Sequence, residues 1–242
     1  MKILLTGAAG CVGSHLLPFL QDRKARVTCF AGDIREWQEW SRYLGTKWDY
    51  LIHLAAIPGV RRSFEEPEFY YDNNVNGTHN ALTFGRMACE RVLYASSSNA
   101  YEWWGNPYAA TKKMCEEIAR VDGRRFKGMR FHTVWPGRDD MLYKKLERGE
   151  VSYINANHHR DWIHVDDLCE AIWTIMSNFN DIRERVLDIG TGQAFNVLEM
   201  AEKRFQWEGE IRTENPKGER IKTRANVQYL YDLGWTPKNN II

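Results

Sequence analysis

The chain has 242 residues, enough for one domain of ordinary size or for a main domain with a smaller satellite. Lys and Arg (33) nearly balance Asp and Glu (32), and no run of like charge stands out, so the electrostatic footprint of a nucleic-acid-binding protein is missing. No apolar stretch approaches the ~20 residues of a membrane span. The five cysteines are an odd number without a C-x-x-C pair, which argues against a disulfide framework or a zinc knuckle. We therefore expect a cytoplasmic protein that binds neither nucleic acid nor membrane.

The first part of the chain alternates apolar strands with helices. We expect strands over 1–6, 26–30, 50–55, 91–95 and 128–134, and helices over 14–22, 37–44, 70–89 and 108–121. Strands that alternate with helices of this length predict βαβ units and a parallel sheet.

Beyond Trp135 this alternation breaks down. We expect a helix over 140–147, a short strand over 151–155, a helix over 165–177, a further apolar strand over 186–189 and a mixed C-terminal segment. The predicted fold class is α/β, with a Rossmann-type doubly wound parallel sheet and a small C-terminal cap. Residues 1–134, with a strand at about 185–190, would form the sheet domain, and residues 135–184 and 191–242 would form the cap.

Three glycines stand between the first strand and the first helix. Gly7, Gly10 and Gly13 have the spacing G-x-x-G-x-x-G. Glycine allows a tight turn, lets the backbone approach a pyrophosphate and lets the helix pack on the strand. The helix N-terminus then offers free N–H groups to the phosphates. A purely structural turn would look similar, but the position directly after an apolar strand favours a dinucleotide site.

A tyrosine and a lysine follow the fourth predicted strand at the start of a helix. Tyr108 and Lys112 are four residues apart, which puts them on one helix face, and the serines 96–98 precede them. A neighbouring ammonium group lowers the pKa of a phenol from its reference value of about 10. This pair can therefore supply a phenolate base, whereas a serine run at a strand end could also simply cap a turn.

Several segments resemble one family. Residues 6–15 resemble the opening T-G-x-x-G-x-[IV]-G-S-H of the extended short-chain dehydrogenase/reductases, in the branch of NAD-dependent epimerases and dehydratases. Residues 160–167 resemble that branch's R-D-[FWY]-[IVT]-H-V-x-D, and similar stretches extend over nearly the whole chain. The resemblance implies an enzyme with NAD as its cofactor, a nucleotide-sugar substrate and a cap that binds this substrate.

The adenosine side of the cofactor site departs from the family pattern. Asp33 and Ile34 resemble the family's G-D-[IL]-R-D segment, but only one strand fits between the glycine helix and residues 50–55, where the family has two. We therefore expect a sheet shortened by about one strand, with the remaining strand beside the first and Asp33 at its carboxyl end. Asp33 would serve the ribose hydroxyls, the adenine or both, and could also cap a helix. Because no arginine follows the strand at once to hold a 2′-phosphate, NAD is favoured over NADP.

The resemblance also implies the roles of individual residues. The expected cofactor-binding residues are Gly7, Gly10, Cys11, Val12, Gly13, Asp33, Ile34, Leu54, Ala55, Ala56, Asn73, Tyr108 and Lys112. The expected catalytic residues are Tyr108, Lys112 and Ser97, and the expected substrate-binding residues are Ser98, Arg61, Thr133, Arg138 and Arg160. Ser98 and Asn99 stand where 4,6-dehydratases carry an Asp-Glu pair, which disfavours dehydration.

The most specific expectation is 4-epimerisation of a UDP-sugar. The segments around Arg61, Tyr108 and Thr133 resemble UDP-glucuronate 4-epimerases more closely than UDP-galactose 4-epimerases, which favours UDP-hexuronates slightly over UDP-hexoses. The alternatives are an NAD(P)-dependent reductase of a keto sugar or small carbonyl and a non-catalytic dinucleotide sensor, and a homodimer is the candidate assembly. The His and Asp residues of 158–167 fit no common metal-site spacing, so no metal is expected. Residues 186–192 mimic a methyltransferase glycine motif, but too few residues follow them for that fold.

Overall fold

The computed structural model of this protein describes residues 1–121 and 125–242. Unit 1 consists of Met1–Arg130 and Arg183–Leu187, and unit 2 consists of Phe131–Ile182 and Asp188–Ile242. These limits lie within a few residues of the sequence-derived domain limits, whose assignment to cofactor and substrate remains a prediction.

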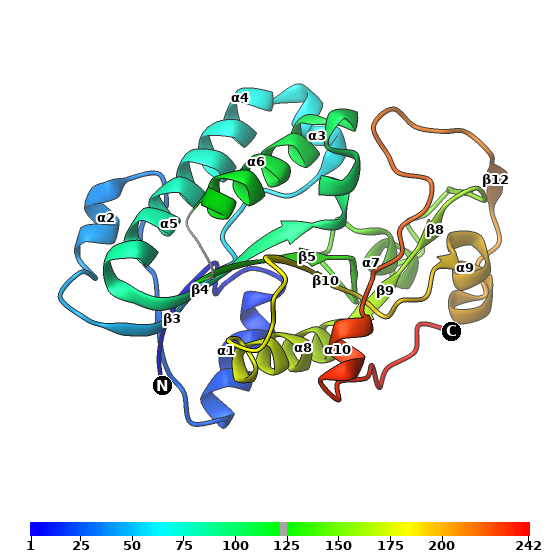
Figure 1. The fold of residues 1–242 in the computed structure, drawn as a ribbon. Helices are drawn as coiled ribbons and strands as arrows, with labels where there is room; N and C mark the ends of the chain where they lie inside the picture. The colour runs from blue at the N-terminus through cyan, green and yellow to red at the C-terminus, as the bar shows by residue number, and fades with distance from the viewer. Residues whose placement is uncertain (122–124) are drawn as a thin grey trace. The chain divides into compact units, whose positions relative to one another are not determined.

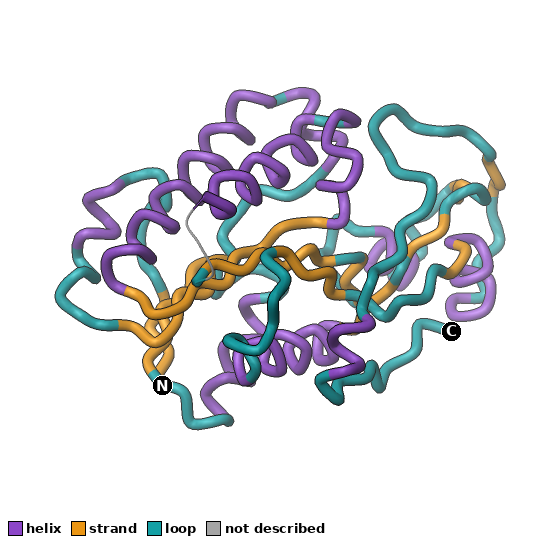
Figure 2. The backbone as a smooth tube through the Cα atoms, in the orientation of Figure 1, coloured by secondary structure: helices purple, strands orange, loops and turns teal. Residues whose placement is uncertain are grey.

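A six-stranded parallel sheet forms the central layer of unit 1 (Figure 2). Its strand order is β10-β5-β4-β3-β1-β2. The strands are β1 (Lys2–Thr6), β2 (Arg26–Cys29), β3 (Trp48–His53), β4 (Cys89–Ser97), β5 (Phe126–Phe131) and β10 (Val186–Ile189). The strands β1, β3 and β4 each contain a short apolar run because helices cover both faces of the sheet; Leu4, Leu51 and Leu93 are fully buried. The predicted Rossmann-type sheet is confirmed.

The shortened edge of the sheet is also confirmed. Only β2 lies between the first helix and β3, and it pairs with β1 in parallel, with Lys2 opposite Arg26. The other side of β1 pairs with β3. Because β2 is the edge strand and mostly exposed, the chain can lack a further outer strand without uncovering the buried strands.

Helices cover both faces of the sheet in unit 1. They are α1 (Gly13–Asp22), α2 (Trp37–Ser41), α3 (Val60–Glu65), α4 (Pro67–Tyr70), α5 (Gly77–Ala88) and α6 (Pro107–Val121), with a π-helical turn η1 (Tyr71–Asn76) and a 3₁₀ segment η2 (Ser98–Gly105). α5 and α6 lie on one face and α1 on the other (Figure 1). The helix expected over 70–89 is thus α4, η1 and α5 in succession. The wider π turn changes the direction of its side chains, and such turns are frequent at functional sites.

The prediction of one continuous strand over 128–134 is wrong, because the chain changes its hydrogen-bonding partner between His132 and Thr133. The His132 N–H donates to the Ile189 carbonyl, whereas the Thr133 N–H donates to the Asp161 carbonyl. Residues from Thr133 on form β6 (Thr133–Trp135), which pairs with β9 (Trp162–His164) instead of continuing β5. The sequence could not reveal this, because the change depends on which distant segment each half meets, Ile189 for His132 and Asp161 for Thr133.

Unit 2 combines short paired strands with helices. Besides β6 and β9 it contains α7 (Leu142–Glu147), β7 (Tyr153–Asn155), β8 (His159–Arg160), α8 (Val165–Ser177), β11 (Phe195–Asn196), α9 (Val197–Phe205), β12 (Glu210–Arg212) and α10 (Gln228–Asp232). β7 pairs with β12 and β8 with β11. One apolar cluster of this unit surrounds Trp135, Trp162 and Met200.

The glycine-rich stretch at 190–192 has a structural purpose in unit 2. It wraps the buried Asp161, whose carboxylate accepts hydrogen bonds from the N–H groups of Thr191 (2.7 Å), Gly192 (2.9 Å) and Ala225 (2.9 Å). A Cβ at Gly190 would lie 2.9 Å from this carboxylate. The methyltransferase-like motif therefore supplies backbone hydrogen-bond donors to a buried aspartate.

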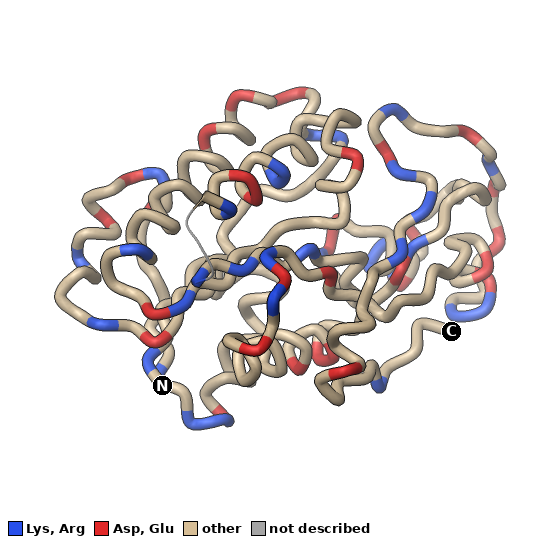
Figure 3. The backbone as a smooth tube through the Cα atoms, in the orientation of Figure 1, with Lys and Arg blue, Asp and Glu red and all other residues tan. Residues whose placement is uncertain are grey.

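The surface carries mixed charge. Basic and acidic residues are interspersed along the chain in both units, as Figure 3 shows. Within the described residues, no helix has both the length and the apolar character that crossing a membrane requires.

Candidate functional site

The glycine turn after β1 is too tight for side chains at two of its positions. Gly7 has φ +70°, and a Cβ there would lie 2.7 Å from the Ala55 backbone nitrogen. A Cβ on Gly13 would overlap the Gly7 carbonyl oxygen, whereas a Cβ on Gly10 would meet only this oxygen, at 3.2 Å. Gly7 and Gly13 are thus required by the protein itself, and Gly10 leaves the outer side of the turn open.

The first helix starts at this turn without a side-chain cap. Val12 precedes α1, makes no capping hydrogen bond and has helical backbone angles. Cys11 is half-buried, and its carbonyl accepts from the Ser14 hydroxyl at 3.2 Å. The N–H groups of Ser14, His15 and Leu16 donate to the carbonyls of Gly10 and Val12, so an anion at this turn would be met by the N–H groups that precede Ser14.

A pocket of about 520 Å³ opens at the carboxyl ends of the strands in unit 1. It is lined by Gly32, Asp33, Ile34, Ala55, Ala56, Ile57 and Asn73. Five of these residues were expected to bind the cofactor, whereas Gly32 and Ile57 were not. Leu54, which was also expected, does not line the pocket but precedes Ala55 in the chain. This is the position in which doubly wound sheets bind their ligands.

Asn74, which the sequence analysis missed, holds one wall of this pocket in place. Its side chain accepts from the Ile57 N–H (2.8 Å) and donates to the Ile57 carbonyl (3.0 Å) and the Thr111 hydroxyl (3.2 Å). It is fully buried. Asn74 thus ties η1, which carries Asn73, to the loop after β3 and to α6.

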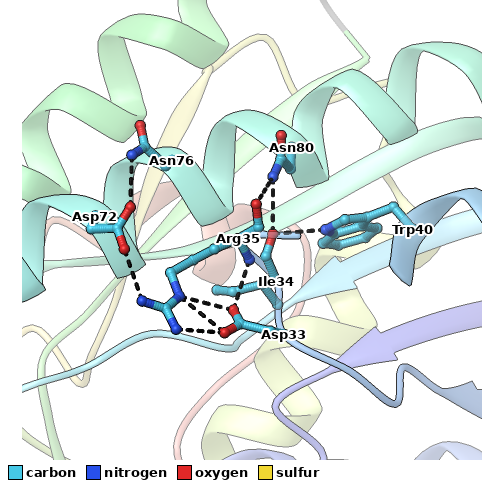
Figure 4. A network of polar contacts seen from close by, with 7 residues as sticks. All are labelled: Asp33, Ile34, Arg35, Trp40, Asp72, Asn76 and Asn80. Atoms are coloured by element: carbon cyan, nitrogen blue, oxygen red, sulfur yellow. Dashed lines mark hydrogen bonds and ion pairs between the residues drawn. The ribbon is translucent and has the colours of Figure 1, made fainter. Parts of the chain in front are cut away.

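Asp33 has a partner that the sequence analysis missed. It follows β2, as expected, and its carboxylate accepts from the Arg35 side chain, with Nη2–Oδ2 at 2.6 Å (Figure 4). The hydrogen bond from Arg35 holds the pKa of Asp33 below its ordinary value, although partial burial opposes this. No arginine follows β2 (Arg26–Cys29) at once, as expected, but Arg35 two residues after Asp33 reaches back to its carboxylate.

Tyr108 and Lys112 lie in the first two turns of α6. Asn106 precedes the helix and accepts from the Ala109 N–H at 2.7 Å. Lys112 is 3% exposed, and its Nζ donates to the Ala95 carbonyl on β4 at 3.0 Å and lies 6.0 Å from the centre of the Tyr108 ring. Burial lowers the pKa of Lys112. The helix spacing and the buried lysine thus place an ammonium group beside the tyrosine.

The serine run at the end of β4 is buried. The Ser97 hydroxyl accepts from the Asn99 N–H at 3.2 Å, so the structural role of a turn cap is present as well. The neighbouring Ser96 hydroxyl donates to the Glu116 carboxylate at 2.6 Å. Ser98, which was expected to bind the substrate, begins η2 and is also buried.

A buried histidine lies behind these residues. His53 Nδ1 lies 2.8 Å from the Thr6 hydroxyl and Nε2 lies 3.2 Å from the Thr78 hydroxyl. Burial, with the charge of Lys112 added, lowers the pKa of His53 to about 3. The imidazole is therefore neutral at physiological pH and bridges two threonines.

The expected substrate-binding residues are divided between the two units. In unit 1, Arg61 is exposed on α3 and Ser98 is on η2; unit 2 contains Thr133, Arg138 and Arg160. Arg138 donates to the Asp140 carboxylate at 2.8 Å, and Arg160 donates to the Ile221 carbonyl at 3.0 Å. Neither unit by itself contains all of the proposed substrate contacts.

The histidines and aspartates of 158–167 have contacts of other kinds. His164 Nδ1 accepts from the Asp166 N–H at 3.3 Å, and Asp161 is engaged as described above. In residues 1–121 and 125–242, no three His, Cys, Asp or Glu side chains are grouped as metal ligands would be.

The family model of NAD-dependent epimerases and dehydratases matches residues 3–196. The chain belongs to this family. CapI of Staphylococcus aureus is 27% identical, with 100% of this chain and 95% of the relative covered. Its alignment runs over 317 positions against the 242 residues of the chain, as expected for a shortened member of the family.

Two further relatives carry more specific names. UDP-glucuronate 4-epimerase 2 of Arabidopsis thaliana is 29% identical over 71% of this chain and 53% of its own. MoeE5, solved with UDP-glucuronic acid and NAD, is 27% identical, with a TM-score of 0.82 over 100% of this chain and 95% of its own. The same protein has also been solved with UDP-glucose and NAD.

The family's cofactor is NAD, and the residues of unit 1 fit it. Side chains at Gly7 and Gly13 would fill space that the turn itself needs, and the uncapped start of α1 suits a pyrophosphate. Asp33, which lines the pocket, is a carboxylate suited to ribose hydroxyls.

Proposed function

We propose that this protein catalyses the NAD-dependent 4-epimerisation of a UDP-sugar. The observation that carries this is the buried Lys112, one helical turn from Tyr108 and hydrogen-bonded to the end of β4, in a member of the epimerase/dehydratase family. The names of the relatives support epimerisation. Asn99, in place of an acidic residue, disfavours dehydration.

Tyr108 is the proposed base. Its phenolate would take the proton of the sugar's 4-hydroxyl, and the ammonium of Lys112, 6.0 Å from the ring centre, favours that phenolate. Lys112 would also hold the cofactor ribose. NAD, when bound, supplies the acceptor and donor of the carbon-4 hydride.

Ser97 is proposed to hydrogen-bond the reacting oxygen. Its hydroxyl oxygen accepts from the Asn99 N–H, so its own proton remains a donor that can point toward the substrate. Burial of the serine at the end of β4 restricts its rotation and excludes water from that side. The serine would thus orient the 4-hydroxyl toward Tyr108.

The proposed substrate is a UDP-hexuronate, with UDP-hexoses next in order. Ser98 and Thr133 would hydrogen-bond the hexuronate carboxylate, and Arg61, Arg138 and Arg160 would balance the carboxylate and diphosphate charge. The likeness to UDP-glucuronate 4-epimerase 2 and to MoeE5 supports this order, although MoeE5 has been solved with both kinds of sugar.

The test begins with the purified protein, which should release NAD⁺ or NADH on denaturation. We expect it to interconvert UDP-glucuronate and UDP-galacturonate with a higher kcat/KM than UDP-glucose and UDP-galactose. A preference for the neutral hexoses would refute the hexuronate and leave the epimerase. Net oxidation of NADPH by a ketone, without isomerisation, would refute the epimerase in favour of a reductase.

Tyr108→Phe tests the mechanism directly. The substitution keeps the ring and removes the proposed base, so turnover should fall by ~10²–10⁴ while NAD binding remains. Tyr153→Phe is the matched control, because Tyr153 lies on β7 in unit 2, outside the Tyr108–Lys112 pair. Unchanged turnover of Tyr108→Phe would overturn the assignment.

A further inference from the structure

The guanidinium of Arg35 is held from two sides by carboxylates. Its Nη2 donates to Asp33 Oδ2 at 2.6 Å and its Nε to Asp33 Oδ1 at 3.0 Å, while Nη1 donates to Asp72 Oδ2 at 2.8 Å. Figure 4 shows the side chain of Arg35 between the two acids, which come from the turn after β2 and from η1. One cation is thus shared by two anions.

This network borders the adenosine side of the cofactor pocket. Asp33 lines the pocket on the β2 side, and Asn73, the neighbour of Asp72, lines it on the η1 side. Asn80, on the helix α5 that follows η1, also donates its amide to the carbonyl of Arg35 at 2.7 Å. Arg35 therefore links two walls of the pocket.

Asp72 is an ionised partner in this network. Hydrogen bonds from Asn76 and then from Arg35 hold the pKa of Asp72 below its ordinary value. With Asp33 also ionised, the three side chains carry a net charge of −1. An arginine in this position would otherwise suit a 2′-phosphate, the group that distinguishes NADP from NAD.

We propose that Asp72 is a specificity-determining residue for the cofactor, because it engages Arg35 and so keeps this arginine from binding a 2′-phosphate. Asp33 then presents its carboxylate to the 2′-hydroxyl of NAD. In Asp72→Asn the Nη1 group of Arg35, whose side chain is 35% exposed, would lose its ion pair, while Nε and Nη2 would still donate to Asp33, which lines the pocket. The inference concerns cofactor choice and is independent of which sugar is converted.

Equilibrium binding tests this inference without turnover. The ligand-free protein is titrated calorimetrically with NAD and NADP, and with AMP and adenosine 2′,5′-bisphosphate, a pair that differs only by the 2′-phosphate. Asp72→Asn removes the charge and keeps the shape and an oxygen for Asn76. We expect the Kd ratio of NADP to NAD, and of the bisphosphate to AMP, to fall about tenfold.

Two further variants identify the cause. Arg35→Gln combined with Asp72→Asn should lose this gain, because the phosphate partner is then absent. Glu66→Gln removes a carboxylate of similar exposure from its ion pair with Arg62, outside the pocket lining, and should leave both ratios unchanged.

Three results would overturn the proposal. One is a ratio that Asp72→Asn leaves within twofold of the original. Another is a lowered Kd ratio that persists when Arg35→Gln is combined with Asp72→Asn. The loss of the repulsion between Asp72 and the phosphate would then explain the result without Arg35. The third is loss of all four ligands from an Asp72→Asn protein with an unchanged melting temperature, which would make Asp72 a builder of the pocket instead.

Discussion

Arg130 and Glu116 form a buried, two-pronged ion pair. Arg130 Nε donates to Glu116 Oε1 at 2.7 Å and Nη2 donates to Oε2 at 2.6 Å, beside the hydrogen bond from Ser96. Burial would lower the pKa of Arg130, but its hydrogen bonds to Glu116 outweigh this and raise it. The pair joins α6, which carries Tyr108 and Lys112, to β5 and to the serine run.

Removing one partner of this pair should strongly destabilise unit 1. Glu116→Gln leaves Arg130, 14% exposed, without its counter-ion, and we expect a loss of about 3 kcal/mol in the free energy of unfolding. Glu117→Gln is the control, because Glu117 is 46% exposed and its surface pairs should contribute less than about 1 kcal/mol. Denaturant unfolding measures both, and equal effects would contradict the prediction.

Asp161→Asn should destabilise unit 2 for a related reason. The Asp161 carboxylate accepts hydrogen bonds from three backbone N–H groups and from the Thr191 hydroxyl. The side-chain amide of the variant would instead turn its NH₂ group, which cannot accept, toward some of these donors. We expect a loss of about 3 kcal/mol, or a melting temperature lower by roughly 10 °C. Asp166→Asn, at a position with 70% side-chain exposure, should change little. Equal melting temperatures of Asp161→Asn and the control would contradict this, because the backbone donors around residue 161 would then accept the amide without loss of stability.

Two alanine substitutions in the glycine turn should affect folding and cofactor binding differently. In Gly13→Ala the new methyl group overlaps the Gly7 carbonyl, so we expect a lower melting temperature as well as loss of NAD. In Gly10→Ala the methyl group meets protein only at 3.2 Å, so the fold should persist while NAD affinity falls by about tenfold or more, because the backbone can no longer approach the pyrophosphate. Thermal unfolding and calorimetric titration distinguish the two outcomes. A Gly10→Ala protein that binds NAD normally would place the pyrophosphate elsewhere.

His53 should make stability depend on pH. Its pKa is lowered in the folded protein to about 3, so between the reference value of about 6.5 and 3 the unfolded chain binds the proton more readily. The free energy of unfolding should thus fall as the pH drops below 6.5, by about 1 kcal/mol between pH 7.5 and 5.5. His53→Gln should remove this part of the slope, while His79→Gln, at an exposed position, should retain it. Parallel slopes for all three proteins would contradict a neutral, buried His53.

The alternation of strands and helices and the glycine turn were predictable from the sequence. Apolar strands alternate with helices, and the turn with Gly7 and Gly13 allows little besides a helix starting against a strand. The four-residue spacing of Tyr108 and Lys112 places them on one face of a helix wherever that helix lies. The missing strand could be read from chain length, because a βαβ unit needs a minimum number of residues.

Only the tertiary structure decided which partners these residues have. Arg35 and Asp72 are far apart in the sequence, and the fold brings η1 beside the turn after β2. The same holds for Asn74 with Ile57, and for Asp161 with the glycines at 190–192. Local sequence determines helix, strand and turn through short-range backbone geometry. Ion pairs and buried hydrogen bonds between distant segments depend on how the sheet and helices pack, which no local pattern encodes.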